Sequence, residues 1–184
     1  TTAEELVKVL SDEGLSAELV DGYPDALIVR GKLNVDTSVA YKEGLYSLQN
    51  LSSQKAVLLL DPKSGSTVVD MCAAPGGKSC AIAEKMGNEG KIFSFDIFEH
   101  KVALIEKAAK RLGIDIISAN VGDSCVCIDE LVNKADYVLA DVPCSGLGVT
   151  ASKPELKLTA DPSSFDGLID IQKKILSNAL RYTK

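Results

Sequence analysis

Hydrophobic and polar positions change their pattern near residue 55 of this chain. From there on, short apolar runs alternate with longer stretches at helical spacing, which is typical of a parallel sheet covered on both faces by helices. The apolar runs predict strands at 67–71, 91–96, 114–119 and 136–141. The stretches between and after them predict helices at 78–86, 99–112, 128–132 and 165–180. The larger part of the chain is therefore predicted to be a Rossmann-like α/β domain.

The beginning of the chain has a different pattern. Apolar residues at helical spacing predict a helix over 3–10, and two short runs predict strands at 16–20 and 26–30 with a turn-rich connection between them. Such a unit buries little surface by itself. We therefore expect a small α+β unit over residues 1–36, part of a larger N-terminal region, and a main domain over residues 37–184.

Charge is distributed unevenly between these two parts. The formal net charge is −6, and residues 1–36 hold eight acidic against three basic residues, which leaves the main domain at only −1. An acidic surface disfavours binding of nucleic acid through the bulk of the molecule, because phosphate contacts need Lys and Arg. The nearly neutral main domain can still carry a local basic strip.

Composition also limits the compartment and the chemistry. No stretch approaches the roughly 20 apolar residues of a membrane span, and the N-terminus resembles no signal peptide. Five cysteines at irregular spacing fit a reducing compartment, and the single imidazole of His100 disfavours a zinc site. We expect a cytoplasmic, monomeric protein with no metal and no membrane contact.

The most informative motif is Asp70-Met-Cys-Ala-Ala-Pro-Gly-Gly-Lys78, which follows a predicted strand and opens a helix. A strand, a glycine turn and a helix N-terminus form an anion site, because unpaired N–H groups and the positive helix end face the bend. Asp96 ends the second strand, where a carboxylate can accept both hydroxyls of a ribose. Asp123 and Asp141 follow the next two strands at the same edge. This pattern predicts a site for an adenosine-containing cofactor.

Three other readings of the glycine motif are possible. A dinucleotide site requires Gly-x-Gly-x-x-Gly, which is absent. A P-loop matches at Gly77-Lys78-Ser79, but its first glycine falls on Cys72 and Pro75 lacks an N–H for phosphate. A third reading is that the glycines have no other role than to cap a helix. Acidic residues at the ends of all four predicted strands disfavour this reading, because a helix cap does not explain them.

A second cluster, Asp141 to Gly146, places a thiol at the end of the fourth strand. A buried structural role is open to any cysteine, but Cys144 lies in a loop at the cofactor edge. A methyl donor beside a thiol suggests methylation at C5 of a pyrimidine, where thiolate addition at C6 activates C5. Lys78 and Asp141 are candidates for contacting the base, and the thiol must lose its proton to act.

These clusters resemble those of the RNA cytosine-C5 methyltransferases, in particular the bacterial 16S ribosomal RNA methyltransferase B type. Further segments, 41–44 with 47–54, 153–157 and 172–176, are similar to the same family. The resemblance implies a class I methyltransferase fold with RNA, in particular 16S rRNA, as the partner. It also implies that S-adenosylmethionine is held by Cys72, Ala73, Ala74, Pro75, Gly76, Gly77, Lys78, Asp96, Asp123 and Asp141.

The resemblance changes the expected role of Cys144. In the RNA enzymes the cysteine after proline assists product release, and the nucleophile is a second cysteine in a Thr-Cys pair on a later strand. This sequence contains no Thr-Cys pair. We therefore expect a catalytic core that is incomplete at its C-terminus, binds the cofactor and is inactive alone.

Two rival functions remain open at this point. One is a DNA or small-molecule methyltransferase that uses Cys144 directly as its nucleophile. The other is a non-catalytic protein that binds the cofactor or takes part in RNA assembly. A covalent trap with fluorinated cytosine in RNA or DNA distinguishes the first, and the presence or absence of a Thr-Cys strand in the gene bears on the second.

Overall fold

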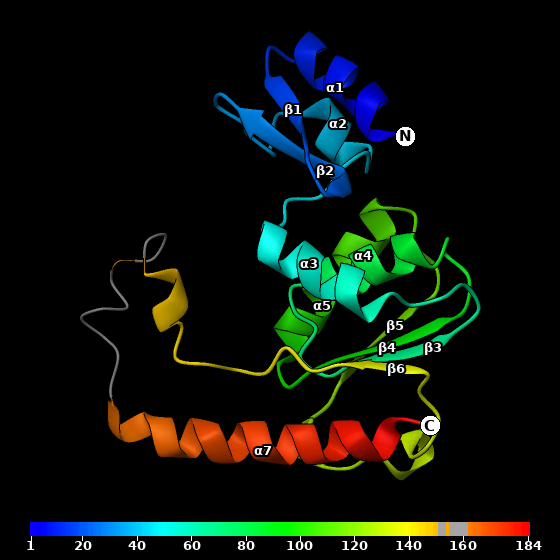
Figure 1. Cartoon of the computed structure of the whole chain (residues 1–184), viewed down its shortest axis with the longest axis vertical. Coiled ribbons are helices and arrows are strands. Elements are labelled where there is room, and N and C mark those ends of the chain that lie inside the picture. Colours follow the sequence, from blue (N-terminus) through cyan, green and yellow to red (C-terminus); the bar gives the residue numbers. More distant parts are fainter. Residues whose placement is uncertain (151–153, 155–161) are drawn as a thin grey trace.

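The main domain is built on a four-stranded parallel sheet (Figure 1). The computed structural model describes residues 1–150, 154 and 162–184. The strands are β3 (Thr67–Asp70), β4 (Lys91–Asp96), β5 (Ile117–Val121) and β6 (Tyr137–Leu139). Their order across the sheet is β5-β4-β3-β6. The prediction of a parallel α/β sheet is thus confirmed.

Helices cover both faces of this sheet (Figure 1). One face carries α3 (Leu51–Leu60), α4 (Gly77–Lys85) and α5 (Glu99–Arg111), and the other carries α7 (Phe165–Tyr182). Successive strand residues point to opposite faces. Val68 therefore packs in one core with α4, whereas Val69 packs in the other core with α7.

Several element boundaries differ from the predicted ones. The third strand of the sheet runs over Ile117–Val121 instead of 114–119, because its ladder with β4 begins at Ile92 and Ile117. Ile114 instead follows α5 and is buried in the core with residues of α4 and α5, which explains why this position is apolar. The fourth strand is shorter than 136–141, and the helix predicted at 128–132 is the 3-10 turn η1 (Asp129–Leu131).

The N-terminal unit consists of α1 (Ala3–Asp12) packed on an antiparallel hairpin of β1 (Ser16–Val20) and β2 (Tyr23–Arg30). A capping box between Thr2 and Glu5 begins α1. The second strand starts three residues earlier than predicted, so that only Asp21 and Gly22 form the turn.

The segment between hairpin and sheet contains the short helix α2 (Val39–Lys42) and links the two parts. The Ala40 amide donates to Glu13 Oε1 at 2.8 Å, which attaches α2 to the N-terminal unit. On the other side, Arg111 of α5 donates from Nη1 to the carbonyls of Tyr41 at 2.7 Å and Tyr46 at 2.9 Å. The segment is therefore anchored to both parts of the molecule.

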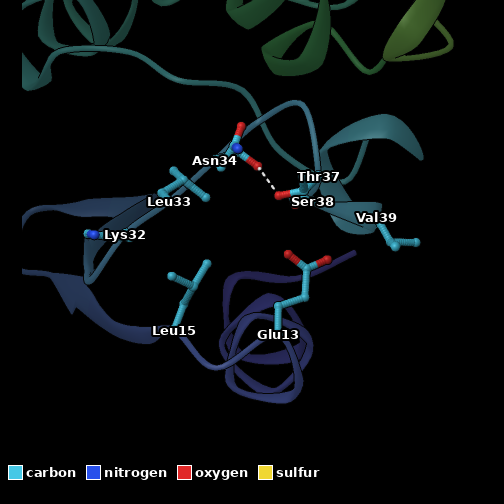
Figure 2. A pocket seen from close by; sticks show the side chains of 8 residues that line it. All are labelled: Glu13, Leu15, Lys32, Leu33, Asn34, Thr37, Ser38 and Val39. Atoms are coloured by element: carbon cyan, nitrogen blue, oxygen red, sulfur yellow. Dashed lines mark hydrogen bonds between the residues drawn. The ribbon is translucent and has the colours of Figure 1, made fainter.

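A pocket of about 220 Å³ lies where α1 ends beside this segment (Figure 2). Its lining residues are Glu13, Leu15, Lys32, Leu33, Asn34, Thr37, Ser38 and Val39. The Thr37 hydroxyl donates to the Asn34 carbonyl at 3.3 Å, as the dashed line shows (Figure 2). The pocket belongs to the N-terminal unit and its linker, and none of the predicted site residues lines it.

Two short 3-10 turns, η2 (Leu147–Val149) and η3 (Pro162–Ser164), precede α7. Of the segment 153–157, which contributed to the family resemblance, only Pro154 lies within the described residues. Among the described helices, none combines the length and apolar character needed to cross a bilayer.

Candidate active site

The candidate site lies where the strand order reverses. After β3 the chain continues outward to β4 and β5, and it then returns to place β6 on the other side of β3. In open parallel sheets, ligands bind at the carboxyl edge beside such a switch point. The two sequence motifs follow β3 and β6, and both therefore lie at this position.

The loop after β3 is held by the strands on either side of it. The Met71 amide donates to the Leu139 carbonyl of β6 at 2.9 Å, and the Ala73 amide donates to the Phe95 carbonyl of β4 at 2.8 Å. Gly76 ends the loop at φ 102°, and a Cβ there would lie 3.0 Å from Ile105 Cα. A left-handed backbone conformation and a close neighbour together require glycine.

The first turn of α4 presents free donors toward this edge. Gly76 is the N-cap of the helix and provides no side-chain hydrogen bond. The first backbone hydrogen bond of the helix runs from the Cys80 amide to the Gly76 carbonyl. Within the described part of the chain, the amides of Gly77, Lys78 and Ser79 have no acceptor. Three N–H groups at the positive end of a helix suit an anionic group of a ligand.

The two motifs meet through one ion pair. Lys78 Nζ lies 2.6 Å from Asp141 Oδ2, with side-chain exposures of 22% and 56%. The Lys78 side chain is therefore mostly covered, whereas the Asp141 side chain is exposed. This pair places a hydrogen-bond donor and an acceptor side by side between the first and second motifs.

Asp96, the last residue of β4, and Asp123, which follows β5, lie at the carboxyl ends of two neighbouring strands. Asp96 is nearly buried, and its Oδ1 accepts a hydrogen bond from the Phe98 amide at 3.1 Å. Its Oδ2 has no partner within the described residues and can accept hydroxyl groups. Asp123 is exposed, and its Oδ1 accepts from the Cys125 amide at 2.8 Å.

Asp70 forms a buried polar cluster beneath the loop. The Ser79 hydroxyl donates to Asp70 Oδ2 at 2.7 Å, and the Ser94 hydroxyl donates to Ser79 Oγ at 2.8 Å. The other carboxyl oxygen, Oδ1, is buried without a hydrogen-bond partner in the described structure. Burial raises the pKa of Asp70 to about 6, although the Ser79 hydrogen bond opposes this.

The cysteines differ in their exposure. Cys144 is exposed in the loop after β6, where the Gln172 side chain donates to the Pro143 carbonyl at 2.9 Å. No interaction joins its thiol to Lys78 or Asp141 within the described residues. Burial raises the pKa of Cys72 to about 12 and that of Cys80 to about 11. Cys144 is therefore the accessible thiol of this edge.

The sequence of this domain matches a known family model. Residues 57–184 match the model described as 16S rRNA methyltransferase RsmB/F. The chain belongs to this family. Its match includes the whole sheet, the loop at Cys72–Lys78 and the loop at Cys144.

A curated relative is also similar in sequence to this chain. The chain is 41% identical over 174 residues to "Probable ribosomal RNA small subunit methyltransferase B" of Bacillus subtilis, covering 94% of this chain and 38% of that protein. The chain thus spans about two fifths of the length of this curated relative.

Solved structures share the fold. "Crystal Structure of PH0851" superimposes with a TM-score of 0.96 at 34% identity, over 100% of this chain and 42% of that one. A methyltransferase homolog protein from Pyrococcus horikoshii superimposes with a TM-score of 0.83 at 29% identity, over 98% and 57% of the two chains. The class I methyltransferase fold is confirmed.

Several polar side chains at this site were not singled out by sequence reasoning. Ser79 and Ser94 surround Asp70, and Gln49 approaches Gly77 from the linker before α3. In the sequence, Ser79 stands out only as the last residue of the partial P-loop match. Gln49 lies in the segment 47–54, which resembles the family but carries no chemical signal at this residue. Among the described residues, no group of three or more His, Cys, Asp and Glu could hold a metal ion.

Proposed function

We propose that this chain is the cofactor-binding part of an RNA cytosine-C5 methyltransferase that acts on small-subunit ribosomal RNA. The observation that carries the proposal is the 2.6 Å contact between Lys78 and Asp141, which joins the two motif loops at the switch point. The family match and the printed names of its relatives support the RNA substrate. The domain division at residues 36 and 37 is part of the same proposal.

The proposed cofactor is S-adenosylmethionine, whose sulfonium supplies the methyl group when it is bound. The donors of the α4 first turn, at the end of the loop Cys72–Lys78, fit its amino-acid end. The free Oδ2 of Asp96 fits the ribose hydroxyls, and Asp123 is proposed near the adenine. The donor set on the protein thus complements both ends of this molecule.

The proposed target base lies against the ion pair. The Asp141 carboxylate can accept from the exocyclic amine of cytosine, and the Lys78 ammonium can donate to a ring carbonyl. Cys144 is assigned to product release. The attacking thiol is assigned to a Thr-Cys pair that this sequence lacks, so the chain alone should not methylate.

Calorimetric titration tests the cofactor assignment. The 184-residue chain should bind S-adenosylmethionine, and Asp96→Ala should weaken binding about tenfold or more, since a hydrogen bond to a charged group contributes about 1.5–3 kcal/mol. Asp115→Ala is the matched control, because this exposed acid lies before β5, at the opposite edge of the sheet. Equal affinity of the Asp96 variant and wild type would refute the ribose assignment.

One alternative is favoured by the exposure of Cys144, namely attack by this thiol itself. In the presence of S-adenosylmethionine, RNA and DNA that contain 5-fluorocytosine trap a thiol adduct at C6, because after methyl transfer C5 carries fluorine in place of the proton whose loss releases the thiol. We expect no adduct with this chain on either nucleic acid. An adduct that forms with wild type and is abolished by Cys144→Ala would make Cys144 the nucleophile, and the trapped nucleic acid would identify the substrate.

A further inference from the structure

Gln49 carries an unused hydrogen-bond donor next to the proposed cofactor loop. Its Nε2 atom is buried and has no hydrogen-bond partner within the described residues. A Cβ built on Gly77 would lie 3.7 Å from this atom, so the amide approaches the backbone of the first residue of α4. A buried amide without a partner is costly, and a bound group that accepts its hydrogen bond would remove that cost.

The backbone that Gln49 Nε2 approaches offers hydrogen-bond donors. The amides of Gly77, Lys78 and Ser79 have no acceptor within the described residues. Glycine at position 77 leaves the space beside Gln49 without a side chain. A ligand group that satisfies all of these donors must be an acceptor with several lone pairs, such as a carboxylate.

The position of Gln49 is fixed from both directions along the chain. Upstream, the Arg111 guanidinium binds two linker carbonyls and stacks 3.8 Å from the centre of the Tyr41 ring. Gly44 packs so closely that a Cβ there would lie 2.1 Å from the Arg111 carbonyl oxygen. Downstream, α3 begins two residues after Gln49 and packs on α4. The backbone on both sides of Gln49 is therefore anchored before any ligand arrives.

We infer that Gln49 donates from Nε2 to the carboxylate at the amino-acid end of the cofactor. The inference rests on the proposed function, because that function supplies the cofactor. Gln49 then acts at the opposite end of the molecule from Asp96, and from a segment that precedes the sheet. It is a cofactor-contacting residue that none of the motifs contains.

The test compares two ligands that differ only at the end in question. S-adenosylhomocysteine carries the amino-acid group, whereas 5′-methylthioadenosine has the same nucleoside without it. In calorimetric titrations, Gln49→Met should weaken S-adenosylhomocysteine binding about tenfold, and Gln49→Glu should weaken it further by repelling the carboxylate. Both variants should bind 5′-methylthioadenosine within about twofold of wild type. Asn50→Ala, at the exposed neighbouring position, should leave both affinities unchanged.

Three results would overturn the inference, and they are distinguishable. Equal losses for the two ligands would mean that Gln49 acts on the fold of the whole site. If Gln49→Glu retained S-adenosylhomocysteine affinity and raised the melting temperature, the side chain would be a cap of α4, with its oxygen toward the helix. If wild type bound neither nucleoside, the proposed cofactor itself would be refuted, and the inference with it.

Discussion

The surroundings of Asp70 disfavour its negative charge. Asp70 is buried beneath the glycine loop, and one carboxyl oxygen has no partner within the described residues. The pKa is raised from 3.8 to about 6, so the folded protein holds this proton more tightly than the unfolded chain does. Stability from this group is complete below about pH 4, falls between about pH 4 and 6, and stays low above that range.

Replacing Asp70 with asparagine should remove this dependence. Between pH 4 and pH 8, wild type should lose about 3 kcal/mol of unfolding free energy relative to Asp70→Asn, since each pKa unit corresponds to about 1.4 kcal/mol. Urea denaturation of both proteins at pH 4, 5, 6 and 8 measures the difference. Asp115→Asn, at an exposed position, serves as the control and should follow the wild-type profile. Parallel profiles for wild type and Asp70→Asn would contradict the assignment.

At the scale of elements, the junction between β3 and α4 depends on one glycine conformation. Gly76→Ala should destabilise the chain by about 1–3 kcal/mol, because a side chain must adopt φ 102° and contact Ile105 at 3.0 Å. The loss should appear in chemical denaturation and be accompanied by weaker cofactor binding.

Gly167 in α7 gives the matched comparison. It is exposed, has ordinary helical conformation, and a Cβ there meets nothing within 4 Å. Gly167→Ala should therefore stabilise the chain by about 0.5–1 kcal/mol. Changes of the same sign in the two variants would show that backbone conformation does not control the junction.

The elements that sequence predicted well are those with clear ends. The strand before Asp70 and the helices ended by Gly87 and Gly113 were placed within about two residues, because glycine stops and abrupt polarity changes are local signals. The helix α3 was not predicted, since its apolar run at 56–60 has no helical period. The start of β5 was predicted too early because Ile114, which precedes the strand, is apolar. Ile114 packs in the core and does not pair with β4.

At the site too, some contacts follow from local sequence signals and others do not. Lys78 and Asp141 could be expected to meet, because loops at the carboxyl ends of adjacent parallel strands share one edge. The contacts of Ser94 and Gln49 could not be predicted, since they depend on side-chain directions and on a linker path that no local pattern encodes.

For the whole molecule, Arg111 connects the linker to the domain. Arg111→Lys cannot reproduce both carbonyl hydrogen bonds and the stacking on Tyr41, because a lysine ammonium lacks the planar guanidinium. We expect trypsin to cleave after Lys42 several times faster in this variant, as measured by the initial rate of fragment appearance. Lys110→Ala is exposed on the same helix and should leave the rate unchanged. Equal cleavage rates in wild type and Arg111→Lys would show that other contacts hold the linker.

The exposure of Cys144 also makes this edge open to covalent labelling. Three of the other four thiols, those of Cys72, Cys80 and Cys125, have a raised pKa, chiefly because of burial, and so form little thiolate at neutral pH. A maleimide dye or a spin label should therefore attach first at Cys144. The same reactivity makes this loop the first place where two molecules would join through a disulfide in air. A reductant in the buffer thus protects the very surface that the proposed RNA substrate would approach.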